Sequence, residues 1–258
     1  MAIDLHAQWF SDLPELRYAS TPKRLRAALD GRTVMDTRDA LLVYEPRRVV
    51  PFYAVPPADL DLDLKEHDPA PVPDGFGPVL SPHHLEWHEI PGRSLHLDGH
   101  GEVAFRPDDP ALGGRVMLHW EPFVWTEEDE PVIAHPHDPF KRIDVLRTDR
   151  HVRVEVGGVT VADSTRATAL FETALPVRWY LPPDDIRMDL LTPSDTRTQC
   201  AYKGTASYVS ADGAPDVAWF YPDPLHDALP VKDLLCFWRA ATVYVDGESA
   251  DTSMLGEG

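Results

Sequence analysis

The chain has 258 residues, with 24 basic against 43 acidic side chains, a net charge of −19 and an isoelectric point near 4.9. A surface this acidic repels phosphate backbones and anionic lipid, so we expect neither nucleic-acid nor membrane partners. Its 43% hydrophobic and 26% charged residues are typical of a globular protein with a packed core.

The two cysteines, Cys200 and Cys236, exclude a disulfide framework, and neither has the spacing of a zinc finger. The N-terminal sequence MAIDLHAQWF lacks a basic leader followed by an apolar run. No stretch approaches the ~20 apolar residues of a membrane helix. We therefore expect reduced thiols and a cytoplasmic location.

The first element expected in chain order is a helix. Ser20-Thr21-Pro22 precede the sequence KRLRAAL, and Gly31 follows it, which predicts a short amphipathic helix from Lys23 to Leu29.

From Thr33 onward the pattern favours strands. Short apolar or alternating runs are interrupted by proline, which accounts for 26 of the 258 residues, so few segments offer an unbroken helix. Alternating valines on both sides of Gly157-Gly158 predict a β-hairpin from Val152 to Val161. We expect a mainly β protein with short helical turns, one of them near Asp184 to Leu190.

The two halves of the chain carry a repeated pattern. Residues 34–53 align with residues 161–180 at a constant offset through the pairs Val34/Val161, Asp36/Asp163, Tyr44/Phe171, Glu45/Glu172, Val50/Val177, Phe52/Trp179 and Tyr53/Tyr180. After a one-residue deletion the alignment continues through Pro56-Pro57 with Pro182-Pro183, Asp59 with Asp185, and Leu60 with Ile186. Self-similarity on this scale indicates duplication of a folding unit. We predict two tandem compact β-sheet units over 1–150 and 151–250, and a flexible tail over 251–258.

Two further segment pairs extend the alignment. GHGEVAF at 99–105 is matched with YKGTASY at 202–208, and RVMLHWEPF at 115–123 with DVAWFYPDP at 216–224. The segment EHDPAPVPDGFG at 66–77 has only a short counterpart and is predicted to be an exposed loop. The segment TEEDEP at 126–131 is expected to be a solvated loop of the first copy, with charges that need no partner.

On this alignment the second copy holds side chains that the first lacks. Tyr202 and Lys203 align with Gly99 and His100 of the first copy. Trp219, Tyr221 and Asp223 align with Leu118, Trp120 and Pro122. We therefore expect the functional site in the second copy and a degenerate first copy.

The segments VADSTRATALFE, VRWYLPPDDIRMDLL, TQCAYKGTASY and AWFYPDP, followed by VYVDGE, resemble the bacterial family catalogued as domain of unknown function 427. The resemblance is strong over 158–248 and weaker over 31–158. It implies a compact all-β domain of the β-tent type, although the cysteine quartet that binds zinc in several β-tent proteins is missing. The family also carries a nucleotidyltransferase-like label, but the chain has no glycine-rich phosphate loop and no paired metal-binding aspartates.

The candidate ligand-binding residues of the second copy share polar or aromatic character; they are Arg166, Glu172, Tyr180, Asp185, Tyr202, Lys203, Tyr208, Trp219, Tyr221 and Asp223. Lys203, beside Gly204, is either an anchor for a carboxylate or phosphate or a surface lysine in a turn. Arg166 is either an anion clamp or an internal partner of Glu172 or Asp185.

The other candidates also have two interpretations each. Glu172 has Glu45 as its counterpart in the first copy. It is either a general acid or base or a carboxylate that pairs with a basic neighbour. The aromatic residues are either a pocket wall or core. Cys200 adjoins Lys203, but with no histidine base beside it in the sequence nucleophilic catalysis is not expected.

Most histidines lie in the first copy: His83, His84, His88, His96, His100, His119, His135 and His137. They would form a metal site only by converging, and adjacent strand residues point to opposite faces, so we expect exposed loop histidines and no metal.

The leading hypothesis is a pocket in the second copy for a small anionic or planar ligand. The alternatives are a non-catalytic structural protein that assembles with itself or a partner, and a metal-dependent nucleotidyltransferase-like enzyme. The sequence fixes neither a reaction nor a cofactor.

Overall fold

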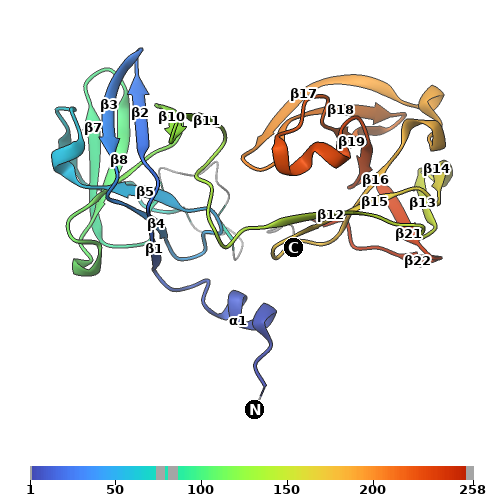
Figure 1. The fold of residues 1–258 in the computed structure, drawn as a ribbon, viewed down its shortest axis with the longest axis horizontal. Coiled ribbons are helices and arrows are strands. Elements are labelled where there is room, and N and C mark those ends of the chain that lie inside the picture. The colour runs from blue at the N-terminus through green and yellow to red at the C-terminus, as the bar shows by residue number, and fades with distance from the viewer. Residues whose placement is uncertain (1, 74–78, 81–86, 254–258) are drawn as a thin grey trace. The chain divides into compact units, whose positions relative to one another are not determined.

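The computed structural model describes residues 2–73, 79–80 and 87–253. The chain divides into two compact units, Met1–Asp138 and Pro139–Glu257 (Figure 1). The division therefore lies between Asp138 and Pro139 rather than near Arg150, because the strand at Ile143–Arg147 pairs with a strand of the second unit. Each unit is described by itself.

The first unit begins with a short helix and continues as two antiparallel sheets. Its elements are α1 (Leu5–Ser11), β1 (Arg17–Thr21), β2 (Leu25–Leu29), β3 (Arg32–Thr37), β4 (Ala40–Tyr44), β5 (Phe52–Val55), η1 (Pro57–Asp59), β6 (Lys65–His67), β7 (Gly92–Leu97), β8 (Gly101–Pro107), η2 (Pro110–Leu112), β9 (Val116–Leu118), β10 (Val124–Glu127) and β11 (Glu130–Val132). The strand orders are β1-β4-β5-β9-β8-β7-β6 and β11-β10-β2-β3.

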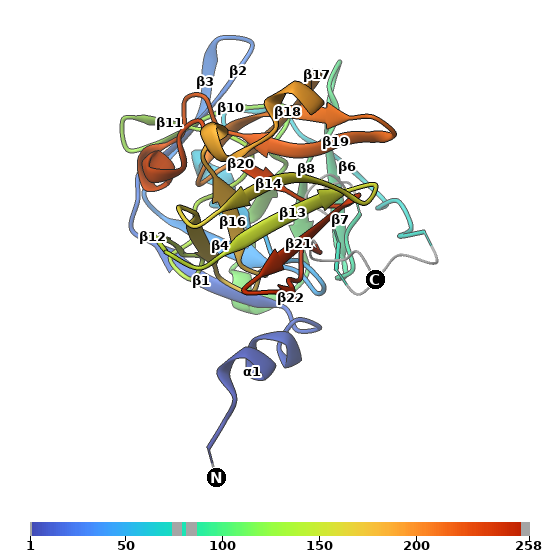
Figure 2. The same cartoon turned by 90° about the vertical axis from the view of Figure 1, so that its right-hand side faces the viewer.

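The second unit repeats this arrangement. Its elements are β12 (Ile143–Arg147), β13 (Val152–Val156), β14 (Val159–Ser164), β15 (Thr168–Glu172), β16 (Arg178–Leu181), η3 (Pro183–Asp185), η4 (Met188–Leu190), β17 (Thr192–Cys200), β18 (Gly204–Ala211), β19 (Ala214–Phe220), η5 (His226–Val231), β20 (Leu235–Phe237), β21 (Ala241–Val245) and β22 (Glu248–Ser249). The orders β12-β15-β16-β20-β19-β18-β17 and β14-β13-β21-β22 match those of the first unit strand for strand. The strands β14, β13, β21 and β22 of the smaller sheet lie towards the viewer in Figure 2. The expected mainly β class with two similar units is confirmed.

The main core of each unit lies between its two sheets. In the second unit it joins Val154 of β13 and Val243 of β21 to Trp179, Val217 and Phe237 of the seven-stranded sheet. Residues that alternate with this core point to the opposite, outer face of the seven-stranded sheet, where a second cluster gathers in each unit. The outer face carries the buried polar groups described below.

The hairpin expected around Gly157-Gly158 is confirmed. Val156 pairs with Val159, and the two glycines adopt φ angles of 57° and 79°. Two successive positive φ angles define the turn that matches the twist of a two-residue hairpin, and glycine adopts them at little steric cost. The turns expected near Asp184 to Leu190 are confirmed as η3 and η4.

The helix expected from Lys23 to Leu29 is wrong. Leu25, Ala27 and Leu29 are buried on alternate positions of β2, which pairs with both β3 and β10. A period of two with partners on both sides outweighs the helix propensity of alanine and leucine. Within the described ranges the α-helix is α1, and no helix there is long and apolar enough to cross a membrane.

The strand register corrects the sequence alignment in two places. Tyr53 pairs with Leu118, the last residue of β9, whereas Tyr180 pairs with Cys236, one residue before the end of β20. Tyr53 and Trp179 also both lie in the main core of their unit. The residue equivalent to Tyr53 is therefore Trp179 and not Tyr180. The strand equivalent to β8 is β19, and that equivalent to β18 is β7, because the strand orders coincide. The backbone N–H groups of His119 and Trp238 donate to Val103 and Val217 in the same way. His119 and Trp238 are therefore equivalent.

The acidic segment at 126–131 is not a solvated loop. It forms the β10–β11 hairpin, equivalent to β21–β22, and Glu127 is buried against Tyr53, Lys23 and the backbone N–H of His137. Burial by itself raises the pKa of a carboxyl group, but hydrogen bonds from His137, Lys23 and Tyr53 outweigh it and lower the pKa of Glu127 to about 2.

We expect Glu127→Gln to lower the free energy of unfolding at pH 7 by about 1–3 kcal/mol, because buried donors lose a charged acceptor. A carboxyl group with a depressed folded-state pKa stabilises the fold above its ordinary pKa of 4.5, and this contribution is lost as the pH falls towards about 2. The difference from the unsubstituted chain should therefore shrink between pH 4.5 and 2 in urea denaturation. Glu130→Gln, on the exposed side of the same hairpin, should change little at any pH.

Candidate functional site

One buried carboxylate marks the outer face of the seven-stranded sheet in both units. Glu45 directly follows β4, and Glu172 ends the equivalent strand β15. Their side chains are only 0% and 7% exposed. A carboxylate withdrawn from water needs cationic or hydrogen-bonding partners, and the two units supply different ones.

In the second unit the partners of Glu172 are lysines. Lys203 Nζ lies 2.5 Å from one carboxylate oxygen, and Lys141 Nζ lies 3.5 Å from the other. Burial would raise the pKa of Glu172, but the charges of Lys203 and Lys141 outweigh it and lower this pKa. Glu172 is therefore held as an anion, which fits a satisfied carboxylate better than a general acid.

Lys203 lies between Glu172 and Cys200. Burial disfavours its ammonium form, but the Cys200 sulfur and the Glu172 carboxylate outweigh burial and raise the pKa of Lys203. Gly204 next to it adopts a φ of 99°, and a Cβ there would lie 3.3 Å from the Asp223 carbonyl oxygen and from the Leu225 nitrogen. The backbone thus turns sharply beside the lysine, and Lys203 is not the surface lysine of the simpler interpretation.

The aromatic candidates form packed core. Trp219 Nε1 donates to the Tyr180 hydroxyl at 3.1 Å, and Trp219 meets Trp238 edge to face with 5.2 Å between centroids. Tyr221 and Tyr208 belong to the same cluster, together with Ala228 and Val231 of η5, which covers it. Burial raises the pKa values of Tyr180 and Tyr221 well above 10, so both phenols stay neutral.

Arg166 and Asp185 pair with each other and do not belong to this aromatic cluster. Arg166 donates to Asp185 from Nε and from Nη2, at 3.2 and 2.5 Å, and Ser164 donates to the same carboxylate at 2.6 Å. The arginine side chain is 59% exposed. Arg166 therefore has the structural partner Asp185. Tyr202 is buried and Asp223 exposed beside Lys203 and Gly204.

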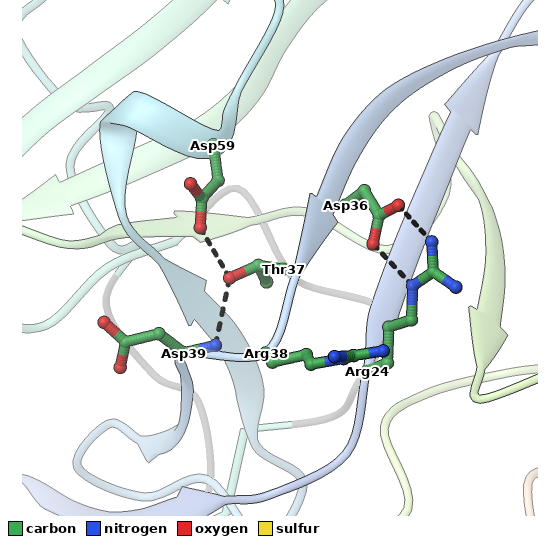
Figure 3. Close-up of a pocket in the computed structure, with 6 residues that line it drawn as sticks. All are labelled: Arg24, Asp36, Thr37, Arg38, Asp39 and Asp59. Carbon is green, nitrogen blue, oxygen red and sulfur yellow. Dashed lines mark hydrogen bonds and ion pairs between the residues drawn. The ribbon is translucent and has the colours of Figure 1, made fainter.

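The first unit repeats the Ser164–Asp185 bond as Thr37–Asp59, with Thr37 Oγ1 donating at 2.6 Å (Figure 3). It lies in an open depression of about 500 Å³ lined only by polar residues: Arg24, Asp36, Thr37, Arg38, Asp39 and Asp59. Arg24 forms a two-pronged ion pair with Asp36. Retention of the hydroxyl–carboxylate bond in both units indicates an architectural role for Asp185.

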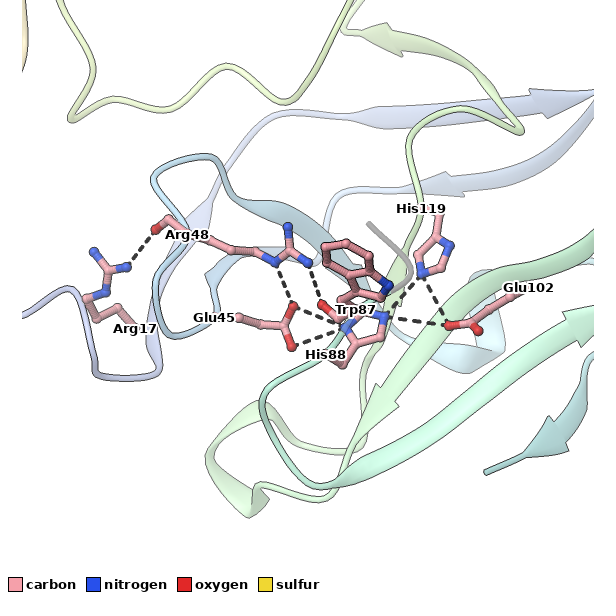
Figure 4. Close-up of polar contacts among 7 residues, drawn as sticks. All are labelled: Arg17, Glu45, Arg48, Trp87, His88, Glu102 and His119. Atoms are coloured by element: carbon pink, nitrogen blue, oxygen red, sulfur yellow. Dashed lines mark hydrogen bonds and ion pairs between the residues drawn. The ribbon is translucent and has the colours of Figure 1, made fainter. Parts of the chain in front are cut away.

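On its outer face the first unit holds a buried network that the sequence did not predict (Figure 4). Arg48 Nε donates to Glu45 at 3.0 Å, and His88 Nδ1 lies 3.1 Å from both oxygens of Glu45. The Nε2 atom of His88 faces the Nε2 atom of His119 at 3.2 Å, and Glu102 Oε1 lies 3.6 Å from each. The expectation of exposed loop histidines is wrong for His88 and His119, which are 7% and 4% exposed.

The two rings titrate differently. Burial disfavours a charged His88, but the carboxylates of Glu102 and Glu45 outweigh burial and raise its pKa. Burial and the charge of His88 lower the pKa of His119 to about 4, so this imidazole is neutral near pH 7. Of the other histidines, His100 is exposed, His96, His135 and His137 are half-buried, and His83 and His84 lie outside the described residues.

Comparison with known proteins finds a family match for the second unit. Residues 144–251 match the family described as Domain of unknown function (DUF427). The match includes Glu172, Lys203 and the aromatic cluster, and it excludes Glu45, His88 and His119. No curated protein matches the chain.

We expect Lys203→Met to lower the free energy of unfolding by about 3–5 kcal/mol, because it removes the nearer cation of a buried carboxylate. Adding Glu172→Gln should restore most of this loss, since the remaining group is then neutral. Urea denaturation of the two variants and of the unsubstituted chain measures both effects. Equal stability of Lys203→Met and the unsubstituted chain would contradict a buried, paired lysine.

Proposed function

We propose that the second unit binds a small oxyanion, a carboxylate or phosphate group, at Lys203 on the outer face of its seven-stranded sheet. The supporting observation is that Lys203 is a buried lysine that stays charged between Glu172 and Cys200. A buried ion pair contributes little to stability compared with apolar residues of the same volume. Perturbed ionisable groups held in this way are enriched at functional sites.

The donor capacity of Lys203 supports the same proposal. An ammonium group has three N–H donors on a flexible stem, and it binds anions as a point charge. Among the described residues, the contacts of Lys203 with Glu172 and Cys200 use two of these donors. The third is available to a ligand oxygen, and the 10% exposure of the side chain gives a small anion access.

The packing narrows the class of ligand. Trp219, Tyr180 and Tyr221 are engaged with one another and with η5, so they offer no open face for a planar ring. A small oxyanion therefore fits better than the planar ligand expected from the aromatic composition. The family description assigns no activity, and we propose binding without a reaction.

Nucleotidyl transfer is not favoured by any cluster found in this unit. Magnesium prefers oxygen ligands, whereas the set of three metal-suited groups within the described residues combines two imidazoles with one carboxylate and lies in the first unit.

We place the oxyanion-binding function in the cytoplasm because Cys200 and Cys236 are both free thiols.

Thermal unfolding of the full chain with inorganic phosphate, acetate or a nucleoside monophosphate tests the proposal. A ligand at about 100 times its Kd stabilises the fold by about 2.7 kcal/mol, which raises the melting temperature measurably. The shift should disappear in Lys203→Met/Glu172→Gln, which removes the Lys203 ammonium group without leaving the Glu172 carboxylate short of its nearer cation.

Arg166→Gln is the matched control, since Arg166 is the other candidate anion ligand and pairs with Asp185 instead. It should keep the ligand-induced shift. No shift with any of the three ligands would contradict the proposal and favour the structural or interaction role. A shift retained by the double variant but lost in Arg166→Gln would move the anion site to Arg166.

A further inference from the structure

Three ligand atoms converge on the outer face of the first unit, outside the residues that match the family. His88 precedes β7, Glu102 lies on β8, and His119 directly follows β9, so three neighbouring strands bring them together (Figure 4). The two Nε2 atoms are 3.2 Å apart, and Glu102 Oε1 is 3.6 Å from each.

These separations match a metal site. A point equidistant from three atoms with these spacings lies about 2.0 Å from each of them, which is the length of zinc–nitrogen and zinc–carboxylate bonds. Three ligands at this distance leave at least one coordination position open for water or another ligand.

The groups around the three ligands orient them in the way that metal sites require. His88 Nδ1 faces both oxygens of Glu45, and donation from Nδ1 leaves the Nε2 lone pair pointing at the shared point. Arg48 fixes Glu45 at 3.0 Å and also donates to the backbone carbonyl of Trp87 at 2.5 Å, next to His88. This is a carboxylate–histidine–metal arrangement with its outer partner already in place.

Ring packing holds the same geometry. His88 stacks on Phe105 with 3.8 Å between centroids and 13° between planes, and Phe52 lies near both imidazoles, at 5.8 and 6.3 Å. Side chains locked by packing present their donor atoms with little loss of entropy on binding. The two imidazoles are therefore held in position in the absence of an ion.

Without an ion, Glu102 Oε1 stays at a distance from both imidazoles. One N–H between the two imidazoles can make a single hydrogen bond, and the buried Glu102 Oε1 lies 3.6 Å from each Nε2 atom, beyond hydrogen-bonding distance. A carboxylate oxygen withdrawn from water is stabilised when a donor or a cation lies closer to it. An ion at the shared point would satisfy all three atoms at once.

We propose that the first unit binds one divalent transition-metal ion, with zinc as the reference ion, through His88, Glu102 and His119. Two imidazoles and one carboxylate suit zinc and iron(II) better than magnesium or calcium. The second unit does not repeat the site, because the residue equivalent to His119 is Trp238.

The test uses the full chain without a histidine tag, stripped with a chelator and titrated with zinc against a chromophoric competitor. One zinc per chain should bind. His119→Gln and Glu102→Gln should each weaken this binding by more than about 100-fold, since loss of an outer partner alone costs about 10–100-fold. His151→Gln, which changes an exposed histidine paired with Asp163 in the second unit, should leave the affinity unchanged.

A second readout does not depend on folded variants. Cobalt(II) added to the stripped chain should give the intense visible absorption of a four- or five-coordinate ion, and one equivalent of zinc should remove it. Absence of tight zinc binding, weak six-coordinate cobalt absorption alone, or unchanged zinc affinity in folded Glu102→Gln would each overturn the proposal. In that last case the cluster is a metal-free hydrogen-bonded network.

Discussion

The burial of a carboxylate at the end of the second strand of each seven-stranded sheet is the constraint on which both outer faces depend. Glu45 and Glu172 occupy equivalent positions in β-sheets of identical strand order, and both are withdrawn from water. Neither unit can bury a charged carboxylate without nearby cations or hydrogen-bond donors. The surrounding side chains are arranged to provide them.

The two units meet this requirement in different ways. In the first, Arg48 follows Glu45 by three residues and His88 arrives from the segment before β7. In the second, the turn after Glu172 reads TALPV and contains no basic residue, so Lys203 and Lys141 arrive from other parts of the unit. One architectural carboxylate thus supports an imidazole network in one unit and a lysine cluster in the other. We connect this difference to two kinds of ligand, a metal ion and an oxyanion.

Local signals in the sequence predicted much of the fold. Gly157-Gly158 between alternating valines and the paired Pro-Pro sequences before η1 and η3 depend on backbone conformations that glycine and proline fix by themselves. The segment from Lys23 to Leu29 did not follow its local propensity, because β3 and β10 complete its hydrogen bonds from outside the segment. The one-residue error at Tyr53 arose because aromatic identity was matched across a gap whose position only strand register reveals.

The candidate site was predicted in part. Lys203 and Glu172 are candidates because of the polar residues that distinguish the second copy from the first, and the structure pairs them. Glu102 and His119 are equally particular to the first unit. The sequence alignment matches β8 with β18, so it does not reveal that β8 and β9 bring Glu102 and His119 together. Convergence of residues from three strands depends on topology, which no local pattern carries.

The most direct test of the two-site account is an anomalous difference map from crystals of the full chain grown with zinc, recorded at the zinc absorption edge. The account predicts a peak about 2 Å from His88 Nε2, His119 Nε2 and a Glu102 oxygen, and none at Glu172 in the second unit. A map with no peak between the two imidazoles, or with equal peaks on both outer faces, would contradict it.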